Sequence, residues 1–304
     1  MSATRAALAG VIDYAGLFPP ASLDLPRVVA NHVRYAHSDE SWLLGRLIVP
    51  LARLGELDDL LDALAVHGSW TISALAQLDD IPRVEALVRQ FNERHAPRWA
   101  VVAIELGAAS PAEVHTIAGG IPERYERYVE VPLDDRLPAF LDAIAATGCY
   151  AKARTGGTRA DAFPAADLVA RFITQCIARE VPCKATAGLH HPIRGSYRLT
   201  YEPQSPTAVM HGFVNLIAAA GLLKAGAVDE HEAAAILDVT DPGALELSAD
   251  RIRLGPHELD AEACTIARAH VLRSIGSCSF EDAIADLRTL RWLGAEGGRP
   301  GAEG

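Results

Sequence analysis

The segment CYAKARTGG (149–157) is followed along the chain by AADLVARFITQCIARE (165–180) and then by VPCKATAGL (181–189). The first and third segments are short and apolar and lead into glycine turns, as buried strands often do. The middle segment has an apolar stripe at helical spacing, formed by Leu168, Val169, Phe172, Ile173, Cys176 and Ile177. A strand, a helix and a second strand in this order predict two parallel strands joined by a right-handed crossover.

The same alternation runs through the first 190 residues. Each earlier apolar run is followed by a stretch with helical spacing, and the runs are Gly10–Phe18, Gly45–Leu51, Ser69–Ala76, Trp99–Gly107 and Arg127–Leu133. Seven alternations predict a closed (β/α)8 barrel, the TIM barrel, with its eighth strand in RSIGSCSF (273–280). An open doubly wound sheet is the alternative, but its G-x-G-x-x-G turn is absent.

The pattern is less regular after residue 200. TAVMHGFVNLIAAAGLLKAG (207–226) reads as one long buried helix, and LELSADRIRLGPHEL (245–259) as a small β-hairpin. With no linker or internal repeat, we expect a single domain over residues 1–293, with this helical and β-hairpin insertion before the last strand. The tail 294–304 has no apolar content and is expected to be disordered.

Composition restricts the class of protein. The chain has 304 residues, a net charge of −11 and 50% hydrophobic residues, without 18 consecutive apolar positions. This argues against nucleic-acid or membrane partners, because both favour basic surfaces or long apolar spans. The N-terminus does not resemble a secretory signal. Five cysteines without a C-x-x-C pair indicate reduced thiols and a cytoplasmic location.

Lysine is rare in this chain and occurs only at Lys152, Lys184 and Lys224. The first two lie near the carboxyl ends of the predicted sixth and seventh strands, and TIM barrels carry their catalytic residues at these ends. Neighbouring strands are about 5 Å apart, so the two amines are expected to lower each other's pKa and free one for attack on a carbonyl. The alternative is that the lysines are solvated or only neutralise a barrel carboxylate.

Three carboxylates also occur in or near predicted strand ends: Asp13, Glu105 and Glu130. A carboxylate beside a catalytic lysine can move the proton that carbinolamine chemistry requires. Glu105 and Glu130 are the stronger candidates, because a carboxylate within an apolar strand is buried and must be paired or functional. The alternative is a structural partner of Arg154 or of a helix N-terminus.

Several polar groups are candidates for binding an anionic part of a substrate. Backbone N–H groups of glycine and serine turns can bind anions, and Phe18, Pro19 and Pro20 form a stiff loop that lines either the pocket or a partner subunit. The candidate anion-binding residues are Arg154, Gly156, Gly157, His190, His191, Ser277 and Ser279.

A metal site is a weaker hypothesis. His190, His191 and His211 are its candidate ligands, together with a strand-end acid, but no H-x-H or H-E-x-x-H spacing supports it. We therefore predict no metal and no cofactor.

The two lysine segments resemble class I (Schiff-base) aldolases of the deoxyribose-phosphate aldolase type. YAKARTGG and VPCKATAGL are similar to the family's lysine motifs on strands six and seven, and SIGSCSF is similar to its phosphate-binding turn after strand eight. The resemblance implies that Lys152 forms the imine and that Lys184 tunes it. The chain departs from the family at Arg154, in the LHHP segment, and in lacking a recognisable acidic proton shuttle.

The leading hypothesis is therefore a lyase that acts on a small carbonyl metabolite through a lysine Schiff base, and a phosphorylated or a carboxylated substrate is compatible with it. Two alternatives stay open: a metal-dependent hydrolase or isomerase, and a non-catalytic barrel that binds an anionic metabolite. A homo-oligomer is compatible with each of them.

Overall fold

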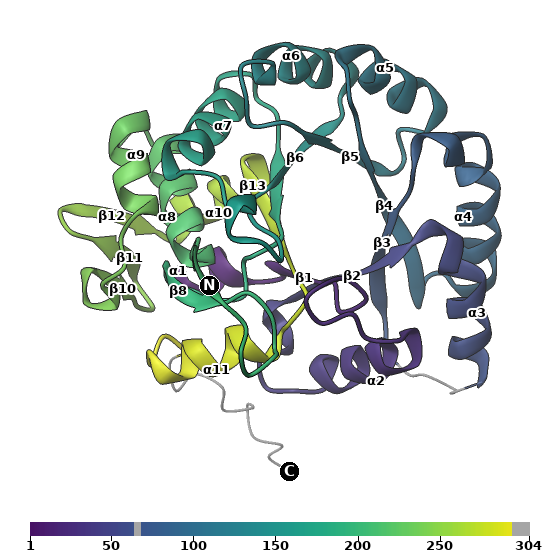
Figure 1. Cartoon of the computed structure of the whole chain (residues 1–304), viewed down its shortest axis with the longest axis horizontal. Coiled ribbons are helices and arrows are strands. Elements are labelled where there is room, and N and C mark those ends of the chain that lie inside the picture. The colour runs from purple at the N-terminus through teal and green to yellow at the C-terminus, as the bar shows by residue number, and fades with distance from the viewer. Residues whose placement is uncertain (64–67, 294–304) are drawn as a thin grey trace.

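A computed structural model describes residues 1–63 and 68–293 and confirms the predicted barrel. Eight parallel strands close in the order β1-β13-β7-β6-β5-β4-β3-β2, and Figure 1 shows them as a ring with helices outside. The strands are β1 (Ile12–Tyr14), β2 (Leu44–Pro50), β3 (Trp70–Leu75), β4 (Trp99–Gly107), β5 (Glu126–Val131), β6 (Tyr150–Arg154), β7 (Cys183–Thr186) and β13 (Leu272–Ser277).

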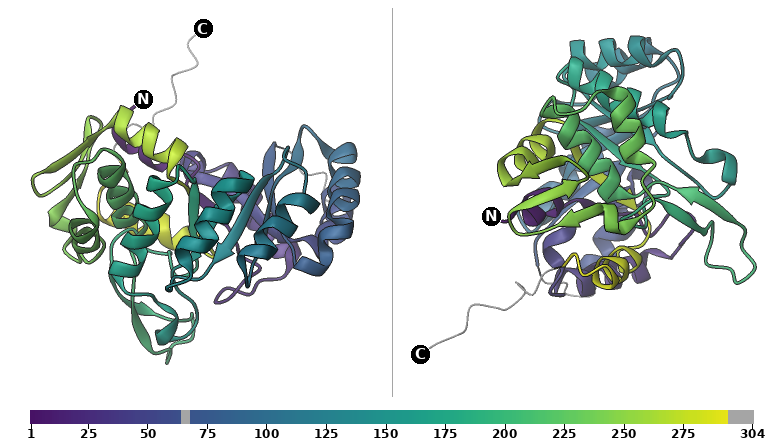
Figure 2. Two further views of the ribbon diagram at one scale, coloured as in Figure 1. Left: turned by 90° about the horizontal axis from the view of Figure 1, so that it is seen from above. Right: turned by 90° about the vertical axis from the view of Figure 1, so that its left-hand side faces the viewer.

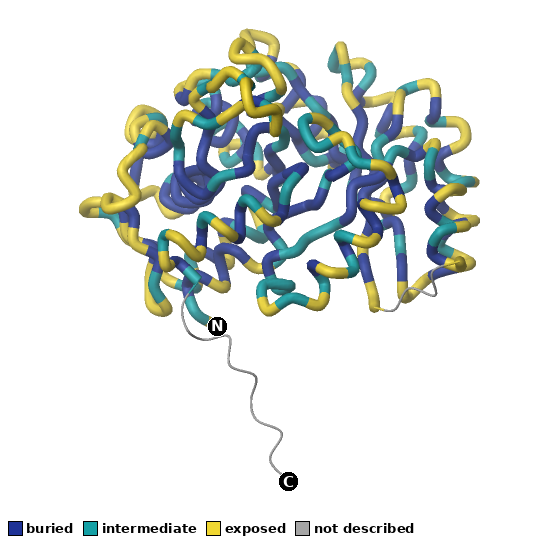
Figure 3. The backbone as a smooth tube through the Cα atoms, turned by 60° about the horizontal axis from the view of Figure 1, so that its bottom comes forward, coloured by how far each residue is buried: buried dark blue, intermediate teal, exposed yellow. Residues whose placement is uncertain are grey.

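Helices cover the outer face of the barrel. Two of them show a boundary that the local sequence predicts: Ser110 caps the start of α5 by accepting from the Glu113 N–H, and Gly148 ends α6 with a φ of 64°. The apolar face of each helix packs on the strands, so buried residues run through the interior in Figure 3. These helices are α2 (Leu25–Ala36), α3 (Leu54–Ala63), α4 (Ile81–His95), α5 (Pro111–Gly120), α6 (Leu137–Thr147), α7 (Ala166–Ala178), α8 (Phe213–Lys224), α10 (Ala261–His270) and α11 (Glu281–Thr289).

The insertion before the last strand differs in detail from the prediction. The expected helix over 207–226 is wrong at its start, because β9 (Thr207–Met210) pairs with β8 (Gly195–Arg198) in an antiparallel hairpin that projects from the body in Figure 2. The buried part of the predicted helix is α8.

The segment predicted as a β-hairpin (245–259) forms a three-stranded antiparallel sheet, which has one strand more than predicted. β10 (Leu245–Leu247), β11 (Arg251–Leu254) and β12 (His257–Asp260) alternate buried and exposed residues, which buries one face against the helices. Two short helices complete this side, α9 (Glu230–Leu237) and the unpredicted α1 (Ala3–Leu8).

The expected disorder of 294–304 lies outside the described residues. Among the residues that the structure describes, no helix is long and apolar enough to cross a membrane. The five cysteines are all buried and unpaired.

Asn215 holds the insertion together, and this leads to a stability prediction. Its buried side chain donates from Nδ2 to the carbonyls of Ile236 and Val239 at 2.9 Å and accepts from the Arg194 N–H at 3.0 Å. Asn215→Leu leaves the Arg194 N–H and the Val239 carbonyl without this partner and removes one of the donors to the Ile236 carbonyl, which still accepts from the Val239 N–H at 3.2 Å. We expect it to lower the free energy of unfolding by about 3 kcal/mol.

Urea denaturation followed by circular dichroism measures this loss. Gln204→Leu, at the exposed tip of the β8–β9 hairpin, is the control and should change the unfolding free energy by less than about 0.5 kcal/mol. Equal effects of the two substitutions would contradict the assigned role of Asn215.

Candidate active site

The two lysines of the sixth and seventh strands lie side by side inside the barrel. Lys152 on β6 is in register with Lys184 on β7, and Glu130 on β5 is in register with Lys152. Both lysines are buried, with 5% and 1% of their surface exposed. Lys152 is the third of the five residues of β6, and Lys184 is the second of the four residues of β7. The expectation that both lie near the carboxyl ends of their strands is therefore wrong for their backbone positions, although both side chains line a cavity formed with the loops that follow the strands.

Glu105 on β4 connects the two amines. Its Oε2 lies 2.9 Å from Lys152 Nζ, and its Oε1 accepts from Lys184 Nζ at 2.8 Å. Ser73 on β3 also donates to Oε1, at 2.7 Å. Only 2% of the surface of Glu105 is exposed, and its carboxylate contacts the two lysines and one serine.

Asp13 on β1 is the second partner of Lys184. Its Oδ2 accepts from Lys184 Nζ at 2.5 Å and from Ser274 Oγ at 2.7 Å. Its Oδ1 accepts from the backbone N–H of Arg46 at 2.9 Å. Gly45 makes room for this carboxylate, since a Cβ there would lie 2.5 Å from Asp13 Oδ1.

Glu130 is the second partner of Lys152. Its Oε2 lies 3.1 Å from Lys152 Nζ, and its Oε1 accepts from Arg154 Nε at 3.4 Å. The Arg154 side chain is 58% exposed, so it lies at the rim. We call the resulting series of alternating charges the charge chain: Asp13, Lys184, Glu105, Lys152, Glu130 and Arg154.

The electrostatics of Lys184 contradict the expectation that the two lysines lower each other's pKa. Burial alone lowers the pKa of Lys184, but Asp13 and Glu105 outweigh burial and raise it above its ordinary value. The physical reason is that a carboxylate lies between the two amines. Lys184 is therefore an ammonium at neutral pH, and its Nζ lies 5.2 Å from the centre of the Tyr128 ring.

The carboxylates of the charge chain are shifted in the opposite direction. Burial raises the pKa of Glu105, yet the attraction of Lys152 and Lys184 outweighs it and holds this pKa well below the usual range. The pKa of Glu130 is also lowered, because Lys152 and Arg154 outweigh its burial. Both carboxylates are ionised at neutral pH.

A cavity of about 240 Å³ opens above the lysines, and we call it the mouth cavity. Lys152, Lys184 and Glu105 line its polar side. Its apolar side includes Ile48 and Leu75 together with the loop 18–20. That loop therefore lines the pocket, which was one of the two positions expected for it.

The predicted anion-binding groups are only partly brought together. Arg154, Gly157 and His190 line the mouth cavity. Gly156 is not among its lining residues, because its Cα packs against Gly188 and Phe163, where a Cβ would lie 2.9 Å from the Gly188 Cα.

Ser277 and Ser279 stabilise the turn that follows β13. The Ser277 hydroxyl donates to the Ser279 carbonyl at 2.9 Å, and Ser279 Oγ accepts from the Asp282 N–H at 3.1 Å, at the start of α11. Neither serine is among the lining residues of the mouth cavity.

The three candidate metal-binding histidines have separate partners. His190 lies 3.1 Å from Ser277 Oγ, and burial lowers its pKa to about 4. His191 pairs with Asp286 at 2.6 Å and stacks on Tyr197, whereas His211 lies 2.8 Å from the Pro164 carbonyl. The histidines therefore do not form a common site.

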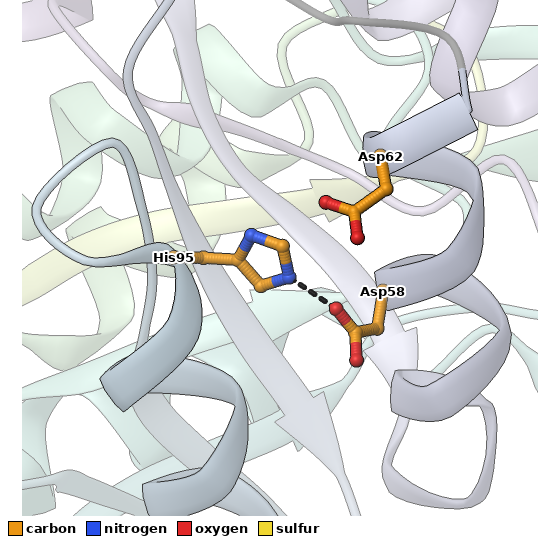
Figure 4. A group of neighbouring side chains, drawn as sticks. All are labelled: Asp58, Asp62 and His95. Atoms are coloured by element: carbon orange, nitrogen blue, oxygen red, sulfur yellow. Dashed lines mark hydrogen bonds and ion pairs between the residues drawn. The ribbon is translucent and has the colours of Figure 1, made fainter.

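Within the ranges 1–63 and 68–293, one group of three potential metal ligands is present, and it lies elsewhere. Figure 4 shows Asp58 and Asp62 on α3 and His95 at the end of α4. Arg94 pairs with both aspartates, and His95 with Asp58. Each of the three side chains therefore has a partner on the neighbouring helix, so the group is explained as a bridge between two helices.

Sequence reasoning missed the residues that hold the charged groups in place. Ser73, Ser274 and Tyr128 face the barrel interior, where two of them donate to the charge chain and the third packs on Lys184. The available signal was a polar side chain at a buried position of a strand, as for Ser73 in TISAL. Gly45 carried no signal, because its role depends on Asp13, which is 32 positions away.

Comparisons with known proteins do not identify a family. No family model matches the chain, and no curated protein matches it. A solved structure, the Bacillus cereus spore cortex-lytic enzyme SleL, is similar over 93% of this chain and 73% of that chain, with 11% identity and a TM-score of 0.41. A similarity at this level supports no functional argument.

Removing Lys184 should destabilise the barrel in a pH-dependent way. Lys184→Met leaves Asp13 and Glu105 buried without their shared cation, and we expect a loss of about 3 to 5 kcal/mol at pH 7. Because the folded-state pKa of Glu105 is lowered, its stabilisation is present above about pH 4.3, the value of an unfolded glutamate, and is lost as the pH falls. The variant should therefore lose less stability between pH 7 and pH 4 than the wild type does.

Urea denaturation at pH 7 and pH 4 tests this prediction. Lys224→Met, at the end of α8, is the matched control and should cost less than about 1 kcal/mol. A Lys184→Met protein with the same acid dependence as the wild type would show that the lysine does not stabilise these carboxylates.

Proposed function

We propose that this protein is a lyase that makes or breaks a carbon–carbon bond in a small carbonyl compound, with Lys152 forming a Schiff base. The observation that supports this most strongly is a pair of buried lysines that share one carboxylate, Glu105, at the floor of the mouth cavity. Strand carboxyl ends are where TIM barrels carry out their chemistry.

Lys152 is the better nucleophile of the pair. Lys184 donates to two carboxylates and packs on the Tyr128 ring, and its raised pKa keeps it an ammonium. One of the two carboxylates of Lys152, Glu130, has a side chain that is 28% exposed. Lys152 therefore contacts one partly exposed carboxylate, whereas both carboxylates that contact Lys184 are buried.

The imine forms with a balanced transfer of protons. The neutral Lys152 amine attacks the carbonyl carbon, and the proton that its nitrogen then loses is matched by the proton that the carbonyl oxygen gains to form the carbinolamine. One further proton lets the hydroxyl leave as water, and the nitrogen is left as a protonated iminium. Glu105 is placed to handle these protons, since it contacts the Lys152 amine. The iminium then accepts the electron pair of the breaking carbon–carbon bond, or in the reverse direction its enamine attacks an aldehyde.

The charge chain makes the proton affinity of Glu105 depend on the state of Lys152. Two ammonium groups hold its pKa down in the free enzyme. When Lys152 becomes a neutral carbinolamine, one of these cations is lost and the proton affinity of Glu105 rises. Lys184 keeps its charge throughout, so it tunes Glu105 without reacting.

The mouth cavity suits a substrate of a few carbon atoms. Its volume of about 240 Å³ is smaller than that of most drug-sized pockets. Arg154 at the rim can pair with a carboxylate or phosphate on the substrate, although it must then share its charge with Glu130.

Reductive trapping tests the imine directly. Acetaldehyde, hydroxyacetone, pyruvate and glyoxylate are each incubated with the protein and sodium cyanoborohydride, and the adduct is located by peptide mass spectrometry. The expected result is a reduced adduct on Lys152 with at least one of these compounds and none on Lys184. Because the chain has three lysines, the assignment is unambiguous.

Two variants act as controls for the trapping. Lys152→Met should abolish the adduct, whereas Lys224→Met should leave it unchanged. A folded Lys152→Met protein that is trapped as fast as the wild type would rule out Lys152 as the imine-forming residue.

Glu105 should set the rate of trapping. Glu105→Gln keeps the size of the side chain but removes its ability to take up a proton, so we expect the trapping rate with the reactive carbonyl compound to fall about 100-fold. Glu246→Gln, on the exposed edge of β10, should leave the rate unchanged. An unchanged rate in Glu105→Gln would assign the proton transfer to another group.

A further inference from the structure

A second cavity lies at the opposite end of the barrel, and we call it the base cavity. Its volume is about 510 Å³, and its walls come from α1, α10 and the amino-terminal parts of β2, β3 and β13. The proposed lyase chemistry does not use it.

The base cavity is rich in arginine. Arg46, Arg268 and Arg273 line it. One carboxylate, Glu126, pairs with two of them, at 2.9 Å from Arg46 Nη2 and 3.2 Å from Arg273 Nη2. Apart from Asp13, Glu126 is therefore the carboxylate that pairs with these three guanidinium groups, and it contacts two of them.

Asp13 also lines this cavity, but its charge is already balanced. Its Oδ2 accepts from Lys184 and Ser274, and its Oδ1 accepts from the backbone N–H of Arg46, not from the guanidinium group. The Asp13 carboxylate thus belongs to the charge chain and leaves the guanidinium groups with an excess of positive charge.

Arg268 on α10 is the least satisfied of the three arginines. Its Nη2 and Nη1 donate to the carbonyls of Ala9 and Leu272 at 3.2 and 3.5 Å. Its Nε is buried without a partner, and it makes no ion pair with any other residue that the structure describes. Burial lowers the pKa of Arg268 to about 10, so the guanidinium is still charged at neutral pH.

We propose that the base cavity binds a small oxyanion, a phosphate or carboxylate group carried by a metabolite. Guanidinium groups bind such oxygens through two parallel hydrogen bonds. A cation without an ion-pair partner gains a counter-charge when an anion enters, and Arg46, Arg268 and Arg273 supply the guanidinium groups that line the cavity. The site is separate from the mouth cavity and does not depend on the proposed lyase activity.

Inorganic phosphate is the probe for this site. Isothermal titration calorimetry in a chloride buffer at pH 7 should show phosphate binding to the wild type, weakened by added salt. Arg268→Gln should raise the Kd at least 10-fold, and Arg273→Gln should raise it in the same direction. Arg253→Gln, on the exposed β11 strand, is the matched control and should leave the Kd unchanged.

Arg154→Gln distinguishes the two cavities. Binding that is lost in Arg154→Gln but kept in Arg268→Gln and Arg273→Gln belongs to the mouth cavity and overturns the proposal. Absence of phosphate binding to the wild type at millimolar concentration also overturns it. Circular dichroism and the Tm establish that each variant is folded, and Arg273→Gln carries the test if Arg268→Gln does not fold.

Discussion

A buried ammonium group needs a carboxylate beside it, and Glu105 meets this need for two lysines at once. Without it, Lys152 and Lys184 would be neighbouring cations in register on adjacent strands, shielded from water. Glu105 on β4 reaches Lys184 on β7, three strands away, because the sheet curves. Asp13 on β1 contacts the same lysine across β13, where the last strand of the barrel pairs with the first. Closure and charge balance are therefore coupled in this fold, since each buried charge obtains its partner from another strand.

The same constraint divides the barrel interior into two ends. Tyr128 lies between them, with its ring below Lys184 Nζ and its hydroxyl donating to Glu126 at 2.8 Å. Above it, positive and negative groups alternate towards the mouth cavity. Below it, arginines outnumber the acidic groups. Asp13 is shared by both ends, because it contacts Lys184 on one side and lines the base cavity on the other.

The sequence contained the strands and the charged residues, but not their pairing. Periodicity placed Lys152 and Lys184 on adjacent strands, because a strand, a helix and a strand in succession form a local unit. The partners of Lys184 are 79 and 171 positions away, at Glu105 and Asp13. Reasoning from β6 and β7 alone therefore predicted that the two lysines repel each other and lower each other's pKa. Asp13 on β1 and Glu105 on β4 instead raise the pKa of Lys184. The β8–β9 hairpin was missed because β9 runs directly into the apolar pattern of α8.

The sequence motifs that resemble those of Schiff-base aldolases do not include an acidic residue that could act as the proton shuttle. In the Schiff-base chemistry that we propose, Glu105 is the group that transfers protons, because it lies within hydrogen-bonding distance of both amines. A carboxylate in that position is a weak base while both lysines are charged, and it becomes a stronger one when Lys152 loses its charge. Lys184 stays charged through its contacts with Asp13 and Glu105, so in the proposed mechanism the proton affinity of Glu105 changes with the state of Lys152. In that mechanism, one permanent cation beside the proposed reactive amine times the proton transfer.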